Sequence, residues 1–295
     1  MEYLVKHRTT YRYLQDVSYS CHLAHLIPRD TGAQHVRNAE LTFSPQPTRR
    51  HRRRDYFGNS AEWFAFDEPH ALLEVLSQSR ITVTTPTPIN PGQTEPWEQV
   101  RAKLESAASA EWRDAVQYCF DSPLTIFKSA IPAYAAESFP KGRPVLAGAI
   151  DLMARIHRDF QYDTTVTDAT TTVDRVFEIR AGVCQDLAHM GIACLRSLGL
   201  AARYVSGYLL TQPPPGRPRL VGADASHAWF SIWAPPFGWV DLDPTNNVLP
   251  GESHITVGWG RDYGDVAPIN GVVTGGADHA IEVSVDVMPF APIPD

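Results

Sequence analysis

Hydrophobic and polar residues alternate along the first part of the chain. β-forming residues occupy every second position between residues 3 and 13, a pattern typical of a half-buried strand. Similar short runs follow at residues 39–43, 62–66 and 74–84, with turn-forming residues between them. No stretch of helical periodicity interrupts these runs. The pattern predicts a small antiparallel β-sandwich over residues 1–88.

A proline-rich segment, residues 85–91, follows the strands and is typical of a stiff linker. We place the boundary between two domains, residues 1–88 and 89–295, within this linker. Beyond it, the composition of residues 97–109 and the apolar stripe of residues 144–159 predict helices. The fold class expected from this order of elements is α+β.

The pattern returns to strands in the last third of the chain. Residues 202–209, 226–233 and 239–243 combine β-branched and aromatic residues and end at turn-forming segments. The segment Ile281–Val287 alternates cleanly between apolar and polar residues. It predicts a closing strand that packs back against a sheet.

The stretch Arg180–Met190 contains the first candidate for chemistry. It predicts a loop that runs into a buried helix, with Cys184 at the helix start. The helix dipole and the unpaired backbone N–H groups at that position favour a thiolate. Gly182 leaves room for a substrate backbone, and Asp186 is near enough on the helix to contact the site. The alternative is that Cys184 is a small core residue, as free cysteines often are.

The predicted strands at residues 226–233 and 239–243 supply a histidine and an acid. If they form a hairpin centred near Pro235, position i pairs with roughly position 470 − i, and His227 lies opposite Asp243. Their Cβ atoms would then be about 5 Å apart, within reach of a hydrogen bond. Asp241 shares the face of Asp243 but pairs with Trp229, so it is the weaker candidate. A shift of one residue would place His227 and Asp243 on opposite faces.

Cys184, His227 and Asp243 are the residue types that nucleophilic acyl chemistry needs. The thiolate attacks an acyl carbon, the imidazole pairs with the sulfur and later delivers a proton, and the carboxylate fixes the tautomer of the imidazole. The same three residues could bind zinc, but no fourth ligand has a suitable spacing, so we expect no metal and no cofactor. Trp229 is a candidate wall of a substrate groove, although strand aromatics more often belong to the core.

Composition and charge narrow the class of protein. Of the 295 residues, 43 % are hydrophobic and 20 % are charged, and the net charge is −7. An acidic chain argues against a nucleic-acid partner, and without a run of about 18 apolar residues we expect no membrane span. Four cysteines without a CxxC pair, and no visible secretory signal, favour the cytoplasm.

The basic run Arg49–Arg54 either binds an anion or, as is usual for charge runs, is a solvated strand. The oligomeric state stays open.

Several segments together resemble one known family. The core segments are similar to the transglutaminase-like superfamily, a branch of the papain-like cysteine enzymes: Gly182–Asp186, Gly199–Tyr208, His227–Trp229 and Asp241–Thr245. Other segments resemble the bacterial members of this superfamily and their N-terminal domain: Leu26–Arg29, Asp55–Asn59 and Gly260–Pro268.

This resemblance implies a papain-like core in which a helix packs on an antiparallel sheet. It implies Cys184 as nucleophile, His227 as general base and acid, and Asp243 as the residue that orients it, with a peptide or protein as substrate. The acyl acceptor is then water, as in a peptidase or amidase, or an amine, as in a transglutaminase. The remaining alternative is a non-catalytic interaction module that retains the fold. The segment Gly260–Val266 is either a loop over the cleft or a connector with local caps and ion pairs.

Overall fold

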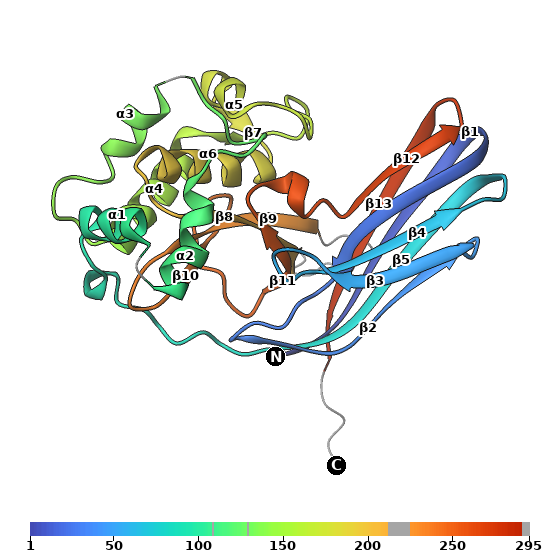
Figure 1. The fold of residues 1–295 in the computed structure, drawn as a ribbon, viewed down its shortest axis with the longest axis horizontal. Helices are drawn as coiled ribbons and strands as arrows, with labels where there is room; N and C mark the ends of the chain where they lie inside the picture. Colours follow the sequence, from blue (N-terminus) through green and yellow to red (C-terminus); the bar gives the residue numbers. More distant parts are fainter. Residues whose placement is uncertain (108, 129, 212–224, 291–295) are drawn as a thin grey trace, which may run out of the picture.

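Strand β1 (Glu2–Ile27) is the centre of the N-terminal part and is 26 residues long. The computed structural model describes residues 1–107, 109–128, 130–211 and 225–290. Within them, β1 pairs antiparallel with β5 along its first half and with β4 along its second half. The main path of the sheet runs β2-β5-β1-β4-β3 (Figure 1). The other strands of this path are β2 (Gln34–Ser44), β3 (Arg49–Arg54), β4 (Ser60–Phe66) and β5 (His70–Val83).

The last two strands of the chain complete the same sheet. Strands β12 (Ile269–Gly275) and β13 (His279–Pro289) both pair antiparallel with β1. The closing strand expected at Ile281–Val287 is therefore present, and its partner is the N-terminal sheet. The sheet that begins in the first domain is thus completed by residues that the linker separates from it in sequence.

The five N-terminal strands form one seven-stranded sheet together with β12 and β13. The alternation in the sequence predicts a sandwich of two sheets instead. The pairing of β1 shifts register between Arg12 and Val17 and again between Ala24 and Ile27. Such irregularities bend a strand and increase its twist, so the sheet curls and its two halves enclose a core. The buried members of this core are Tyr13, Val17, Ala24, Leu26, Ile27, Leu41, Phe43, Phe64, Phe66, Leu73 and Val75. Alternation identifies strands, but it does not tell whether they divide between two sheets or curve within one.

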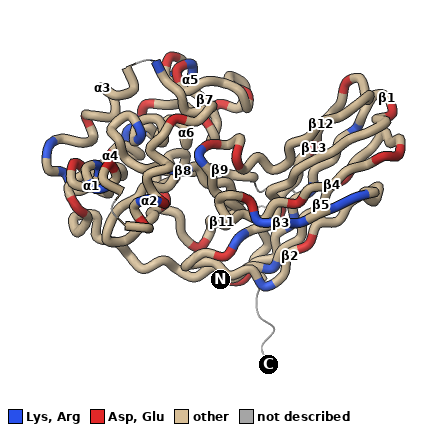
Figure 2. The backbone as a smooth tube through the Cα atoms, in the orientation of Figure 1, with Lys and Arg blue, Asp and Glu red and all other residues tan. Residues whose placement is uncertain are grey.

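The basic run Arg49–Arg54 forms β3, an edge strand whose six residues are all exposed (Figure 2). Arg50 and Arg52 both pair with Glu62, whose side chain is only 1 % exposed. Arg49 pairs with Asp67 at 3.0 Å. These ion pairs fit the interpretation of a solvated strand, and a charged edge resists pairing with another sheet.

A helical region follows the linker. Its helices are η1 (Pro91–Gln93), α1 (Trp97–Ser106), α2 (Ala110–Val116), η2 (Gln117–Cys119), α3 (Ile131–Ala136), α4 (Val145–Asp159), α5 (Val173–Ile179) and α6 (Cys184–Ser197). The helix expected over residues 144–159 is confirmed as α4, with Pro144 as its N-cap. None of the helices in the described ranges is long and apolar enough to cross a membrane.

A second antiparallel sheet carries the order β10-β9-β8-β11. Its strands are β8 (Ala202–Leu209), β9 (Ala225–Trp233), β10 (Trp239–Leu242) and β11 (His254–Gly260). Asp241 pairs with Ser231 and not with Trp229, so the predicted hairpin register is wrong by two residues. The loop 234–238 is centred on Pro236, one position later than assumed. Because the shift is even, each side chain keeps its predicted face, and Asp243 lies just beyond the end of β10.

Helix α6 packs on this second sheet (Figure 1). From Asp186 to Arg196 each of its residues is buried. At Gly191, an added Cβ would lie 2.5 Å from the ring of Phe230 on β9, so only glycine permits this close approach. The sheet therefore holds the helix, and the cysteine at its start, in one position.

Apolar packing also joins the two sheets. One buried cluster combines residues from β1, β5 and β13 with residues from β8 and β11: Tyr3, Val5, Ile81, Val83, Tyr208, Ile255, Val257, Val285 and Val287. The second sheet is therefore supported by α6 and its neighbours and, independently, by the N-terminal sheet.

Candidate active site

Cys184 is the first residue of α6, and its side chain is half-buried. The first backbone N–H groups of a helix have no acceptor within the helix, so the amide of Cys184 is available to a ligand. The other helical cysteines lie in different surroundings. Burial raises the pKa of the Cys194 thiol to about 12 and that of the Cys119 thiol to about 11. Both thiols are therefore held in the neutral, unreactive form.

His227, near the start of β9, joins Cys184 to Asp243. Its Nε2 lies 2.8 Å from Oδ2 of Asp243, and its side chain also forms a hydrogen bond with that of Cys184. Because Nε2 faces the carboxylate, Nδ1 is the ring atom left for the thiol. Burial lowers the pKa of His227, but the hydrogen bonds and negative charges of Asp243 and Cys184 outweigh it and raise the pKa to about 9. The imidazole is thus held in its charged form at neutral pH.

Asp243 is fully buried, and five hydrogen bonds hold its carboxylate. Oδ2 accepts from His227, His254 and the Asn246 amide, while Oδ1 accepts from the backbone N–H groups of Thr245 and Asn246. Burial alone would raise the pKa of Asp243. The bonds from the two histidines, followed by that from Asn246, instead bring it well below the ordinary value of 3.8. A carboxylate in this environment stays ionised and fixed in orientation.

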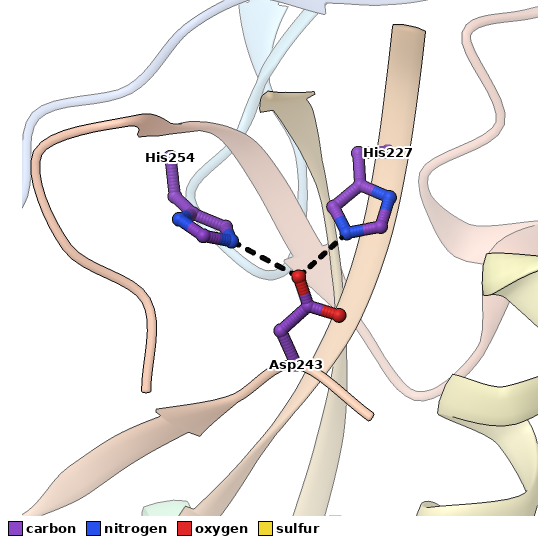
Figure 3. Close-up of side chains that lie close together, drawn as sticks. All are labelled: His227, Asp243 and His254. Atoms are coloured by element: carbon purple, nitrogen blue, oxygen red, sulfur yellow. Dashed lines mark hydrogen bonds and ion pairs between the residues drawn. The ribbon is translucent and has the colours of Figure 1, made fainter. Parts of the chain in front are cut away.

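His254, the first residue of β11, is the site residue that the sequence does not reveal. Its Nε2 lies 3.0 Å from Oδ2 of Asp243, so two histidines approach one carboxylate oxygen from different strands (Figure 3). Its position depends on how β11 pairs with β8, with His254 opposite Leu209. No motif marks it, because strand pairing and not sequence spacing brings it to the site.

His227, Asp243 and His254 also form a cluster of the kind that holds metal ions. One ligand atom of each lies within 4.8 Å of the others, and two imidazoles with a carboxylate suit zinc. Sequence spacing offers no fourth ligand, and His254 is a further candidate ligand that strand pairing brings to the cluster. The histidine nitrogens, however, already hydrogen-bond to the carboxylate, so these atoms are satisfied without an ion.

Gly182 and Asp186 serve the local structure of the helix start. Asp186 is 1 % exposed, and its Oδ2 accepts hydrogen bonds from the Val183 amide at 2.8 Å and from Thr167 at 2.7 Å. A Cβ added at Gly182 would lie 2.6 Å from that same oxygen. The glycine therefore makes room for the capping carboxylate, where the sequence suggests room for a substrate. Neither residue presents a surface to a substrate.

Trp229 lies beneath the two histidines. Its side chain is fully buried, with ring centroids 5.3 Å from that of His254 and 6.0 Å from that of His227. The ring also fills the space above Gly207, where an added Cβ would lie 2.4 Å away. The prediction that Trp229 lines a substrate groove stays a prediction: its ring has no exposed surface and packs against the two histidines.

Tyr162 is an exposed aromatic residue beside the cysteine. It lies on β6 (Gln161–Tyr162), which pairs with β7 (Ala181–Gly182), and it is 53 % exposed. Burial of part of the ring, and then the negative charge of Cys184, raise the pKa of its hydroxyl. Tyr162 thus has the exposure that Trp229 lacks, and its strand pairs with the segment just before Cys184.

The segment Gly260–Val266 makes the local contacts expected of a connector. Arg261 pairs with Asp265 at 2.9 Å, and Asp262 caps η3 (Tyr263–Asp265) by accepting from Gly264. The Tyr263 amide donates to Nε2 of His189 on α6 at 3.1 Å. This segment therefore fastens the end of β11 to the helix that carries Cys184.

Comparisons with known proteins agree with this architecture. Residues 3–82 match the bacterial transglutaminase-like N-terminal region, and residues 133–244 match the transglutaminase-like superfamily. An uncharacterized protein of Mycobacterium tuberculosis is 42 % identical over 98 % of this chain and 93 % of its own length. A protein-glutamine gamma-glutamyltransferase of Pseudomonas aeruginosa is 36 % identical over 97 residues, which are 32 % of this chain and 14 % of that protein.

A solved structure shares the whole fold. It comes from Cytophaga hutchinsonii, is described as a "putative cysteine protease", and superposes with a TM-score of 0.75 at 19 % identity. The match covers 100 % of this chain and 93 % of the other. With both regions matched and a relative similar along nearly its full length, this chain belongs to the transglutaminase-like superfamily, with a bacterial transglutaminase-like N-terminal region before its core.

Proposed function

We propose that the protein is a cysteine-dependent acyl-transfer enzyme that acts on amide bonds of peptides or proteins. The main support is the hydrogen-bonded line from Cys184 through His227 to the buried carboxylate of Asp243. An interaction module would not need an ionised carboxylate held by five hydrogen bonds behind a charged histidine.

The first half of the reaction forms a thioester. The sulfur of Cys184 attacks the carbonyl carbon of the amide, and the Cys184 backbone N–H donates to the oxygen that becomes negative. The imidazolium of His227 then gives its proton to the leaving nitrogen as the carbon–nitrogen bond breaks. Asp243 keeps the ring in position and stabilises its charged form throughout.

The second half releases the acyl group. His227, now neutral, takes a proton from the acceptor, which attacks the thioester carbon and frees the sulfur of Cys184. With water as acceptor, the net reaction is hydrolysis, as in a peptidase or amidase, and this is the outcome we favour. Transfer to an amine is the second candidate, supported by the name of the Pseudomonas aeruginosa relative.

Tyr162 is the residue that we expect to contact the substrate. It offers an exposed ring on a strand that pairs with Gly182, two residues before Cys184, and aromatic surfaces of this kind bind the apolar part of a peptide. In this proposal Tyr162 takes the place of Trp229 as the residue that contacts substrate.

The proposal is tested by labelling and turnover in one experiment. Iodoacetamide at about pH 6, where free thiols react slowly, should modify Cys184 selectively, as read by peptide mass mapping. A library of peptide amides is then incubated with the protein, with and without a dansylated primary amine. We expect release of ammonia or of an amine from some peptides, and loss of this activity in Cys184→Ala.

Cys119→Ala is the matched control, because Cys119 is also half-buried on the helical part but lies outside the site. It should keep both the labelling of Cys184 and the turnover. Equal, slow labelling of all the cysteines, or turnover that survives Cys184→Ala, would refute the proposal. Incorporation of the dansylated amine in place of hydrolysis would support the second candidate.

A further inference from the structure

A cavity of about 500 Å³ lies where the N-terminal sheet meets the second part of the molecule. Arg29, from the segment after β1, contributes one wall, and Asp114 and Tyr118, on α2 and η2, contribute another. The strands of the second sheet supply the floor with Arg203 and two tryptophans, Trp239 and Trp259. The volume is in the range that small-molecule sites occupy.

Arg203 is a nearly buried arginine whose guanidinium stacks on aromatic rings but has no hydrogen-bond acceptor among the described residues. Its side chain is 8 % exposed, and its guanidinium carbon lies 3.8 Å from the ring centre of Trp259 and 4.4 Å from that of Trp239. It forms no side-chain hydrogen bond or ion pair with any other residue in the described ranges, and its Nε is buried without an acceptor. A buried guanidinium normally has its donors satisfied by an acceptor.

Arg29 stacks on the same indole ring. Its guanidinium carbon lies 3.2 Å from the ring centre of Trp259, and its Nη1 donates to the Phe57 carbonyl at 3.0 Å and to Asn59. Its Nε, like that of Arg203, is buried without an acceptor among the described residues. Burial, and after it the charge of Arg203, lower the pKa of Arg29 to about 10. Both guanidiniums therefore stay charged at neutral pH.

Three carboxylates act on these two arginines through their charge: Asp114 and Asp241 on Arg203, and Asp55 on Arg29. Asp114 is the carboxylate that lines the cavity, and its exposed side chain accepts from Gln117 at 3.1 Å. Asp241, the other acid that acts on Arg203 through its charge, accepts a hydrogen bond from Ser231. Neither is close enough to Arg203 for an ion pair. Asp55 acts on Arg29 through its charge, but its carboxylate already contacts His25 and Asn59. The residues that line the cavity thus include two arginines and one carboxylate.

The cavity is separate from the candidate active site. Along β8, Arg203 lies opposite Ser231 and Gly207 lies opposite His227. Four residues of a strand span about 13 Å, so the two sites lie toward opposite ends of the same sheet. A ligand in the cavity would not contact Cys184.

We propose that this cavity binds a small organic anion, an aromatic ring that carries a carboxylate or a phosphate. Guanidiniums bind the paired oxygens of such groups, and Trp239, Trp259 and Tyr118 line the same cavity with aromatic rings. Both groups present negatively charged oxygens to the arginines, and the experiment tells whether the carboxylate or the phosphate is preferred.

Binding is measured on the full-length protein by calorimetry and by tryptophan fluorescence, since two tryptophans line the cavity. The probes are phenyl phosphate, benzoate and, as the uncharged match, benzamide. We expect saturable binding of at least one anion and none of benzamide. Whichever anion binds more tightly identifies the phosphate or the carboxylate as the preferred group.

Two variants change the affinity in opposite directions. Arg203→Gln should weaken anion binding at least tenfold, because it removes the buried charge. Asp114→Asn should strengthen it several-fold, because it removes the opposing carboxylate from an exposed helix position where the fold is unaffected. A gain of affinity cannot come from misfolding, so this second variant keeps the test decisive even if Arg203→Gln is unstable.

Absence of saturable binding by either anion would overturn the proposal. Equal binding of benzamide, unchanged affinity in a folded Arg203→Gln protein, or no gain in Asp114→Asn would do the same. The site does not depend on the proposed enzymatic activity, since Cys184→Ala should bind both anions as the wild type does.

Discussion

The pairing of His227 with Asp243 predicts how strongly the charged form of the imidazole is favoured. The pKa of His227 is about 9, against an ordinary value of 6.5. At about 1.4 kcal/mol for each tenfold change in acidity, this difference corresponds to about 3 kcal/mol in favour of the charged imidazole. Both groups are buried, so solvent screens the interaction little.

Asp243→Asn removes the charge and keeps the shape of the side chain. Burial of the ring, which lowers the pKa of His227, then faces less opposition, so we expect this pKa to fall from about 9 toward 6.5. The neutral ring no longer stabilises a thiolate at Cys184. Alkylation by iodoacetamide at about pH 7 should slow by up to about a hundredfold, the factor that about 3 kcal/mol represents.

Two measurements test this prediction. Nuclear magnetic resonance titration of the imidazole follows the pKa of His227, and the rate of label incorporation follows the reactivity of Cys184. Asp241→Asn is the matched control, because Asp241 lies on the neighbouring strand position of the same face and bonds to Ser231. A pKa of His227 that stays near 9 in Asp243→Asn, or equal slowing in the two variants, would contradict the reasoning.

The same pKa values determine how stability depends on pH. The pKa of His227 is raised on folding, so its contribution is complete below 6.5 and is lost as the pH rises through about 9. The pKa of Asp243 is lowered on folding, so its contribution is present above 3.8 and is lost as the pH falls toward the lower value in the folded protein. Thermal unfolding of the wild type against pH should show both losses, and Asp243→Asn should remove them.

Further variants test other parts of the site. His254→Leu removes a buried donor to Asp243, so we expect a loss of about 1–3 kcal/mol in the free energy of unfolding, measured in urea, with labelling of Cys184 slowed less than in Asp243→Asn. Slowing as large as in that variant would make His254 equal in importance to Asp243. Gly182→Ala would place a methyl group 2.6 Å from Oδ2 of Asp186, so thermal unfolding should show a loss of about 1–3 kcal/mol from overpacking; unchanged stability would mean that the carboxylate moves aside freely. Treatment with a chelator should leave labelling and turnover unchanged, since the cluster at Asp243 is satisfied by its own hydrogen bonds, and restoration of lost activity by zinc would contradict this.

Local patterns predicted most of the elements and the main candidate residues. Alternation of apolar residues identified the N-terminal strands, and the apolar stripe before Phe160 identified α4. Cys184 was found because a helix start is a property of a short stretch of sequence. The prediction that His227 and Asp243 share a face survived a register error, because a shift of two residues preserves the face of a strand.

Other features depend on contacts between distant segments. The return of β12 and β13 to the N-terminal sheet, and the approach of His254 to Asp243, join residues far apart along the chain. The exposure of a side chain is decided in the same way: Gly182, Asp186 and Trp229 stand near Cys184 or His227 in sequence, yet packing buries each of them against a neighbour.

The sequence by itself determined the class of fold and the order of the candidate cysteine, histidine and acid, because these follow from periodicity and residue type within short segments. Only the tertiary structure decided how the acid is held, which aromatic residues are exposed, and that two arginines stack on one indole. These depend on how strands pair and how surfaces pack, and the local periodicity of a sequence determines neither.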